Sequence, residues 1–140
     1  TKQGHVYVIS NIGSFGEEIY KIGLTRRLEP MDRVKELGDA SVPFKFDLHA
    51  MIFSEDAPVL EKKLHEVFHD TRVNMVNNRK EYFRVSLEEI EKETLKVMPD
   101  AEFYKTTESR EYRETLALLQ SKEEQIDTLK QHEDKFPDSI

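Results

Sequence analysis

Glu61 lies on one side of a predicted helix where a carboxylate needs a partner. Residues 57–68 repeat apolar side chains at helical spacing, and at about 100° per residue Glu61 projects at the edge of their apolar arc. Burying an ionised carboxylate is costly unless it pairs with a base or binds a metal. Glu61 is therefore an ordinary edge residue, the partner of a nearby base, or a metal ligand.

His65 follows Glu61 by one helical turn on the same side. Some metal sites use this spacing, although such a histidine is more often a residue at the boundary of the core. An oxygen ligand at Glu61 suits Mg²⁺ or Mn²⁺, which keep several waters and complete their coordination with substrate phosphates. One carboxylate then suffices for a site that acts on a phosphate ester.

Tyr7 and Tyr20 lie in two runs, residues 6–9 and 19–23, that are predicted to be strands. Most strand tyrosines simply pack in a core. If the two strands form a hairpin in a suitable register, both hydroxyls converge on one site. A metal or cation there lowers the pKa of a phenol until it can act as a base.

Three arginines follow these strands. Arg33 lies on a predicted short helix, and an arginine beside a phosphodiester clamps its oxygens and stabilises the charge of the transition state. Arg26 and Arg27 lie in the connecting loop, where they are candidate contacts to DNA phosphates. Taken singly, each is more often a solvated surface charge.

The elements that must position these residues alternate between strands and helices. Runs rich in β-branched and aromatic residues predict strands at 6–9, 19–23, 44–53 and 82–85, the first two as an antiparallel hairpin. Apolar periodicity predicts helices at 29–37 and 57–68, and Ser86 with Glu89 forms a capping box that opens another, which ends by Pro99. This mixture indicates an α+β fold.

The last third of the chain differs in composition from the rest. Residues 93–140 hold 7 Lys/Arg against 12 Asp/Glu, whereas residues 1–92 hold 14 against 16, so most of the net charge of −7 lies in the tail. Acidity opposes DNA binding, but here it is concentrated away from the candidate site. We expect one domain over residues 1–98 and an acidic helical tail over 99–140, with a helix near 107–135.

Two absences bear on location. No apolar run approaches the length of a membrane span, and the chain has no cysteine, hence no disulfide framework and no thiolate zinc site. We expect a protein of the cytoplasm that does not engage a membrane.

The motifs together resemble the GIY-YIG nuclease superfamily. Gly4-His5-Val6-Tyr7 stands for its first motif and Tyr20-Lys21-Ile22-Gly23 for its second, and Arg33 and Glu61 follow in the order of the family's arginine and glutamate. With Lys80-Glu81-Tyr82-Phe83, the chain looks most similar to a phage and bacterial subgroup described as a DNA-binding domain. The resemblance covers roughly residues 4–92.

This resemblance implies a small three-stranded antiparallel sheet flanked by helices, and phosphodiester hydrolysis with one divalent metal. By position, Tyr7 is the general base, Tyr20 assists it, Arg33 steadies the phosphate and Glu61 holds the metal. Asn74 matches an asparagine that supports the site. Glu81 is either a second acidic ligand or a structural cap.

Three functions follow. The first is a metal-dependent endonuclease acting on double-stranded DNA in a phage, mobile-element or defence setting. The second is a catalytically silent DNA-binding module of the same fold. The third is an interaction protein that forms a homodimer through an interrupted stripe on the tail helix, namely Tyr112, Leu116, Leu119, Ile126 and Leu129.

Overall fold

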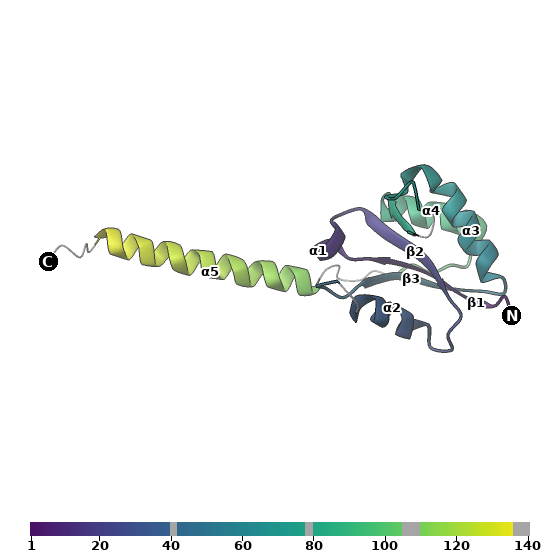
Figure 1. The fold of residues 1–140 in the computed structure, drawn as a ribbon, viewed down its shortest axis with the longest axis horizontal. Helices are drawn as coiled ribbons and strands as arrows, with labels where there is room; N and C mark the ends of the chain where they lie inside the picture. Colours follow the sequence, from purple (N-terminus) through teal and green to yellow (C-terminus); the bar gives the residue numbers. More distant parts are fainter. Residues whose placement is uncertain (40–41, 78–79, 105–109, 136–140) are drawn as a thin grey trace. The chain divides into compact units, whose positions relative to one another are not determined.

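A four-stranded antiparallel sheet organises the first part of the chain (Figure 1). The computed structural model describes residues 1–39, 42–77, 80–104 and 110–135. The strand order is β3-β1-β2-β4, with the four strands spanning Gly4–Ser10 (β1), Ile19–Thr25 (β2), Asp47–Ser54 (β3) and Tyr82–Arg84 (β4). The predicted α+β class is confirmed.

The predicted hairpin forms the centre of this sheet. β1 pairs with β2 so that Tyr7 lies opposite Gly23 and Ser10 lies opposite Tyr20. The short helix α1 (Ile12–Phe15), which the sequence did not predict, joins the two strands, and the Asn11 side chain caps it by accepting from the Ser14 amide. The register fixes which residues of the hairpin share a face.

The resemblance implied three strands, and that count is wrong. β4 adds a fourth, outer strand that pairs with the first three residues of β2. The aromatic run at 82–85 had predicted this strand. The Phe83 side chain anchors β4 to the larger core. It is fully buried, and its ring packs edge-on against Phe68 at 6.3 Å between ring centroids.

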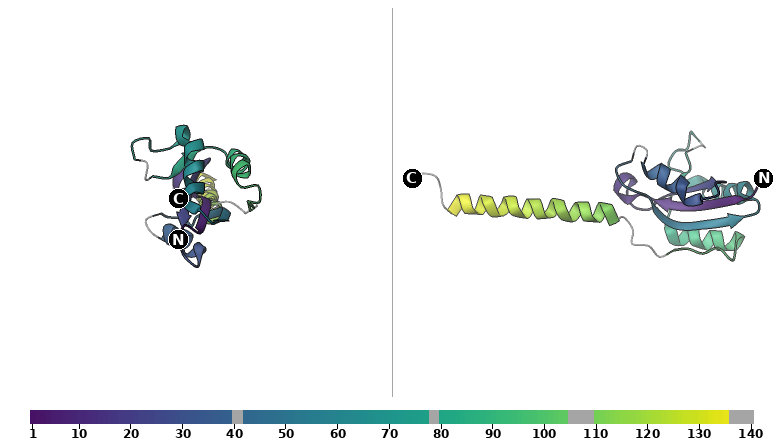
Figure 2. Two further views of the ribbon diagram at one scale, coloured as in Figure 1. Left: turned by 90° about the vertical axis from the view of Figure 1, so that its right-hand side faces the viewer. Right: turned by 90° about the horizontal axis from the view of Figure 1, so that it is seen from below.

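Helices cover both faces of the sheet (Figures 1 and 2). One face carries α3 (Ala57–Val67) and α4 (Leu87–Val97) over the larger core, and the 3₁₀ turn η1 (His69–Thr71) follows α3. The other face carries α2 (Pro30–Asp39), which contributes Val34 to a smaller core with Tyr7 and Ile9. Side chains alternate between faces along a strand, so each core takes every second residue of the hairpin.

The chain divides into two units, Thr1–Ser109 and Arg110–Ile140. The second unit is the predicted helical extension, α5 (Arg110–Lys135). Leu116, Leu119, Ile126 and Leu129 are all exposed on it, and the side chain of Tyr112 lies outside the described residues. Dimerisation through this helix stays a prediction. Among the described residues, no helix is long and apolar enough to span a membrane.

Candidate functional site

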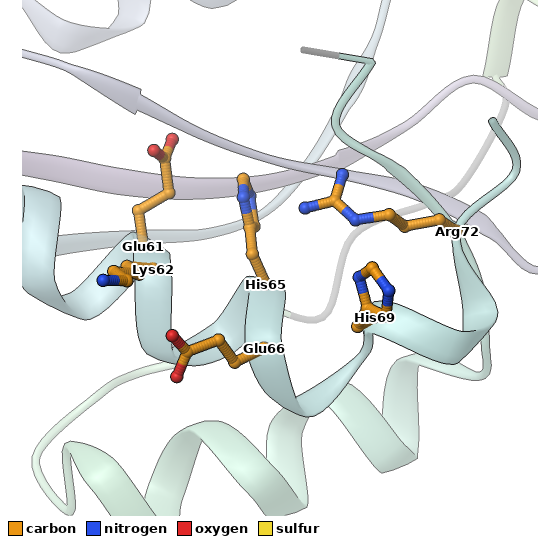
Figure 3. Close-up of a pocket in the computed structure, with 6 residues that line it drawn as sticks. All are labelled: Glu61, Lys62, His65, Glu66, His69 and Arg72. Atoms are coloured by element: carbon orange, nitrogen blue, oxygen red, sulfur yellow. The ribbon is translucent and has the colours of Figure 1, made fainter. Parts of the chain in front are cut away.

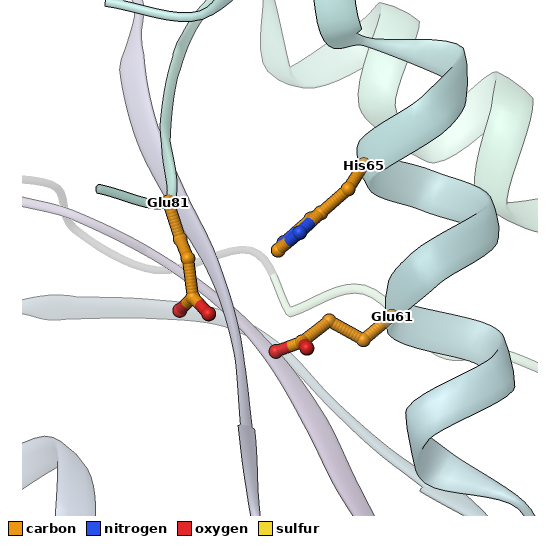
Figure 4. A group of neighbouring side chains, drawn as sticks. All are labelled: Glu61, His65 and Glu81. Atoms are coloured by element: carbon orange, nitrogen blue, oxygen red, sulfur yellow. The ribbon is translucent and has the colours of Figure 1, made fainter. Parts of the chain in front are cut away.

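Three potential metal ligands meet beside β2, on the side of that strand away from β1 (Figure 4). Glu61 and His65 extend from α3, and Glu81 extends from the residue just before β4. One ligand atom from each side chain lies within 4.8 Å of the other two. Each is partly buried, so the group lies at the surface of the domain with access for a substrate.

Local structure explains why these side chains meet. Asp56 caps α3 by accepting from the Val59 amide, and Leu60 and Leu64 of that helix point into the larger core. Glu61 and His65 then lie one turn apart on the flank of α3 that faces β2. The carbonyl of Glu81 accepts the Ile22 amide at 3.1 Å, which fixes the third ligand against the same strand.

Two carboxylates share this small space. Burial and then the nearby charge of Glu81 raise the pKa of Glu61 to about 7, while Lys21 opposes the shift. The Lys21 ammonium lies 3.2 Å from a Glu81 oxygen and 5.2 Å from the centre of the Tyr82 ring. Among the described residues Lys21 forms its ion pair with Glu81 and acts on Glu61 only at longer range, and a divalent ion would compensate the charge of Glu61.

His65 is held in an orientation that suits a ligand. Its Nε2 lies 2.7 Å from the carbonyl oxygen of Ile22, and because a carbonyl only accepts, Nε2 is the donor. Burial lowers the pKa of His65, which favours the neutral ring. A neutral ring that donates from Nε2 keeps the lone pair on Nδ1, the arrangement in which imidazoles bind metals.

Tyr7 comes to the site from the opposite face of the sheet. A Cβ on Gly23 would overlap the end of the Tyr7 ring and its hydroxyl, so the phenol lies directly over that glycine. Burial raises the pKa of Tyr7 to about 12, and Glu81 and Glu61 add to the rise, while the charge and hydrogen bond of Arg33 lower it. These influences show that Tyr7, Arg33 and the two carboxylates lie in one electrostatic environment.

Tyr20 does not join this group. It lies three residues before Gly23 on β2, so its side chain is on the other face, where it packs in the larger core. Its ring lies edge-on to His49 at 5.3 Å between centroids. In this register the two tyrosines lie on opposite faces of the hairpin, so the condition for their hydroxyls to converge is not met.

Lys21 occupies the place that sequence reasoning gave to Tyr20. It lies two residues before Gly23, on the face of Tyr7, and contacts Glu81. The signal was present in the sequence, because strand alternation pairs residue 21 with residue 23 once Gly23 is placed opposite Tyr7. Only the strand register, which the structure provides, shows that Gly23 lies opposite Tyr7.

Six residues gather around the ligand group, and we call them together the rim site. They are Tyr7, Lys21, Arg33, Glu61, His65 and Glu81.

Arg26, Arg27 and Asn74, the remaining candidates, lie apart from the ligand group. Arg26 is exposed in the β2–α2 loop. Arg27 forms an ion pair with Glu36 of α2, and Arg33 lies 3.7 Å from the same carboxylate. Asn74 lies in the loop after η1, where its side-chain oxygen accepts from the amides of Val76 and Asn77.

A pocket of about 500 Å³ opens beside the ligand group (Figure 3). Besides Glu61 and His65, it is lined by Lys62, Glu66, His69 and Arg72. Arg72 lies over the Phe83 ring, 5.0 Å from its centre, which holds the guanidinium near the site. Cations at the mouth of a carboxylate site suit an anionic substrate bound through a metal.

The chain belongs to the T5orf172 domain family, whose model matches residues 4–98. This domain occurs in phage and bacterial proteins and is related to GIY-YIG-like nuclease folds, although no GIY-YIG model matches the chain directly. No curated protein and no solved structure shows a significant match. The resemblance is thus confirmed at the level of a phage-type domain related to these nucleases.

Proposed function

We propose that this protein is a metal-dependent DNA endonuclease that hydrolyses phosphodiester bonds by a GIY-YIG-type mechanism with one metal ion. The observation that carries the proposal is the meeting of Glu61, His65 and Glu81 within 4.8 Å of one another, beside the Tyr7 phenol. Membership of the T5orf172 family supports a DNA-related role in a phage or mobile-element setting. The cytoplasm is the compartment in which such a protein meets DNA.

The donor set fits a hard divalent cation. Two carboxylates and one neutral imidazole suit Mg²⁺ or Mn²⁺, and Mg²⁺ leaves several positions to water and phosphate oxygens. Glu61 is the main ligand because it lacks the close cation that Glu81 has in Lys21. When bound, the metal supplies Lewis-acid stabilisation of the charge on the phosphate and the leaving oxygen.

The protein's own groups divide the remaining work. Tyr7 takes the proton from the attacking water, and Arg33 binds a non-bridging phosphate oxygen while it lowers the pKa of Tyr7. A tyrosine with a pKa of about 12 stays protonated at neutral pH, so very little of it is available to accept a proton. Two of the influences that raise this pKa are the charges of Glu81 and Glu61, and a divalent cation that these carboxylates would hold would offset both charges.

Lys21 takes the assisting role in place of Tyr20. Its ammonium lies on the face of Tyr7 and beside Glu81, so it orients that carboxylate and adds positive charge where the phosphate binds. Tyr20, in the larger core, supports the fold. Arg26 and Arg27 contact the DNA backbone outside the reacting phosphate, and Asn74 shapes the loop after η1 rather than the ligand group.

A silent DNA-binding module is the second candidate. One observation favours it, namely that Tyr7 is buried with a pKa of about 12 and has no second tyrosine on its face of the hairpin. In that case the rim site binds a phosphate of the DNA and does not cleave it.

The test is nicking of supercoiled plasmid at low salt with Mg²⁺ or Mn²⁺, with DNA binding measured in parallel. We expect metal-dependent nicking by the native chain, and its loss in Glu61→Gln and Tyr7→Phe while both still bind DNA. The matched control is Glu91→Gln on α4, which removes the same charge from an exposed position.

Each result has a defined meaning. Nicking that survives in Glu61→Gln, or that needs no metal, overturns the single-metal mechanism. DNA binding by the native chain with no cleavage in any metal establishes the silent module.

A further inference from the structure

A second pocket lies along the same face of the hairpin as Tyr7 and Lys21. It has a volume of about 440 Å³. Its walls come from α1, β2, the loop after η1 and the start of β4, and we call it the Tyr82 pocket. The residues that line it are Ser14, Phe15, Ile19, Val73, Asn74, Lys80 and Tyr82.

The strand register joins this pocket to the rim site. Ile19, Lys21 and Gly23 are alternate residues of β2 and therefore lie in one row on the same face. Ile19 lines the Tyr82 pocket, Lys21 contacts Glu81, and Gly23 lies under the Tyr7 hydroxyl. Four residues of strand cover about 13 Å, a length that a short piece of one DNA strand spans.

The Tyr82 side chain contacts both the Tyr82 pocket and the rim site. Its ring contacts Phe15 on the pocket side, at 5.0 Å between centroids, and Lys21 lies 5.2 Å from its centre. The planes of the two rings are inclined by 53°, so a planar ligand can stack on the face of one ring and pack against the other.

The polar groups of the pocket are mainly donors. The Ser14 hydroxyl is buried and makes no hydrogen bond with the described residues. The Asn74 oxygen is already occupied by two backbone amides, so its NH₂ group is the part left for a ligand. Lys80 adds an ammonium group. Three donors around an aromatic wall suit a flat ligand with an acceptor-rich edge.

We infer that the Tyr82 pocket binds one unpaired nucleobase of the DNA, with a preference for guanine. Guanine presents two adjacent acceptors, O6 and N7, on one edge, whereas cytosine presents an amino donor in the corresponding region. The base stacks on the Tyr82 ring and packs against the tilted Phe15 ring, and its backbone runs along β2 past Lys21 toward Tyr7. This inference rests on the proposed function, because it takes DNA as the substrate of the rim site.

The pocket then selects where the enzyme acts. An extruded base costs least where the duplex is mismatched, damaged or already single-stranded. The domain would therefore bind most tightly to DNA that holds an unpaired guanine near the reacting phosphate.

The experiment compares the affinity of the full chain for two duplexes of equal length and charge, measured by fluorescence anisotropy without divalent metal. One is fully paired, and the other holds a single guanine opposite an abasic site. We expect about tenfold tighter binding of the second, as stacking of one base on aromatic side chains provides. A third duplex with cytosine at the same position should bind less tightly than the guanine duplex.

Two variants test the assignment of the pocket. Ser14→Ala removes a hydroxyl that has no partner in the free protein, so it should lower the preference for unpaired guanine without lowering the melting temperature. Lys80→Ala should lower it as well. Lys92→Ala on α4 removes the same charge from an exposed position and should leave the preference unchanged.

The outcomes separate this inference from the proposed function. Equal affinity for the paired and guanine duplexes, a preference that survives in both Ser14→Ala and Lys80→Ala, or no DNA binding at all overturns the pocket assignment. Plasmid nicking together with equal affinities retains the nuclease and overturns only the pocket. A preference for unpaired guanine without nicking in any metal retains the pocket and overturns the nuclease.

Discussion

The two faces of the β1–β2 hairpin each hold a tyrosine, Tyr7 on one and Tyr20 on the other, in different surroundings. On one side Tyr20 contacts His49, whose ring bonds Ser10 at 2.7 Å inside the larger core. On the other side, Tyr7 reaches the edge where His65 lies among ionisable groups. The comparison teaches that the residue type is the same on both faces and that the surrounding charge decides which tyrosine is suited to chemistry.

The largest expected difference between the faces is catalytic. Tyr7→Phe should lower metal-dependent nicking by about a hundredfold or more, because a general base contributes about that much. Tyr20→Phe should change it less than about twofold, since the ring stays packed in the core. Single-turnover nicking rates check both variants. Equal losses in the two would mean that the faces are coupled.

The next effect concerns the packing of Tyr7 on Gly23. Gly23→Ala forces a methyl group into the Tyr7 ring, so it should lower the free energy of unfolding by about 2–3 kcal/mol and displace the phenol. Gly38→Ala is the matched control, because its Cβ would lie 3.5 Å from Lys45 in ordinary contact. Urea unfolding and nicking should both single out Gly23, and an unchanged Gly23→Ala would show that Tyr7 does not rest there.

A smaller effect separates the faces by pH. Glu61 has a pKa raised from 4.5 to about 7, so the folded protein holds a proton that the unfolded chain has lost, and the free energy of unfolding falls as pH rises through that window. Burial lowers the pKa of His49 from 6.5 to about 4, so there the unfolded chain holds the extra proton and stability rises with pH.

Each group should change the free energy of unfolding by roughly 1–3 kcal/mol across its pH window, in opposite directions, because one pKa unit corresponds to about 1.4 kcal/mol. We expect Glu61→Gln to steepen the rise of stability between pH 4 and 7, and His49→Gln to reverse it. Urea titrations at several pH values provide the measurement. Parallel curves for the two variants would refute the assignment of these pKa shifts.

The smallest effect lies at the edge of the rim site. Glu36 holds both Arg27 and Arg33, so Glu36→Gln should release two cations and raise DNA affinity about twofold to fivefold at low salt. The gain should shrink as salt increases, because exposed pairs are screened. Glu91→Gln again serves as the control for charge alone, and an equal gain in that variant would argue against a specific role for Glu36.

The sequence predicted most of the fold because its signals are local. The hairpin, the helix over residues 57–68 and the capping box at Ser86 all follow from periodicity or turn chemistry, and each is present. The short helix α1 was missed because four residues hold too little periodicity to read. The residue pattern predicted the fourth strand at 82–85, and the wrong count of three came from the family resemblance alone.

The site was less accessible to sequence reasoning because it depends on register. Glu61, His65 and Glu81 were all candidates, but their approach to one another depends on where β4 joins β2. Motif matching selected Tyr20 and not Lys21 because it uses only the position in the sequence. The face of the sheet on which a residue lies depends on the strand register. His49 was not predicted at all, since the register shift beside it in β3 turns the ring into the core.

The shortness of β4 has a further consequence, for how the protein associates with itself. An outer strand is a template on which a second chain can add, and natural sheets limit this risk by keeping such strands short. β4 offers only three residues, and its outer side is partly covered by the Arg72–Phe83 bridge and by the Val73 amide, which donates to the Tyr82 carbonyl. The shortness of β4 and the segment that covers it therefore leave little free strand edge on which a second chain could add.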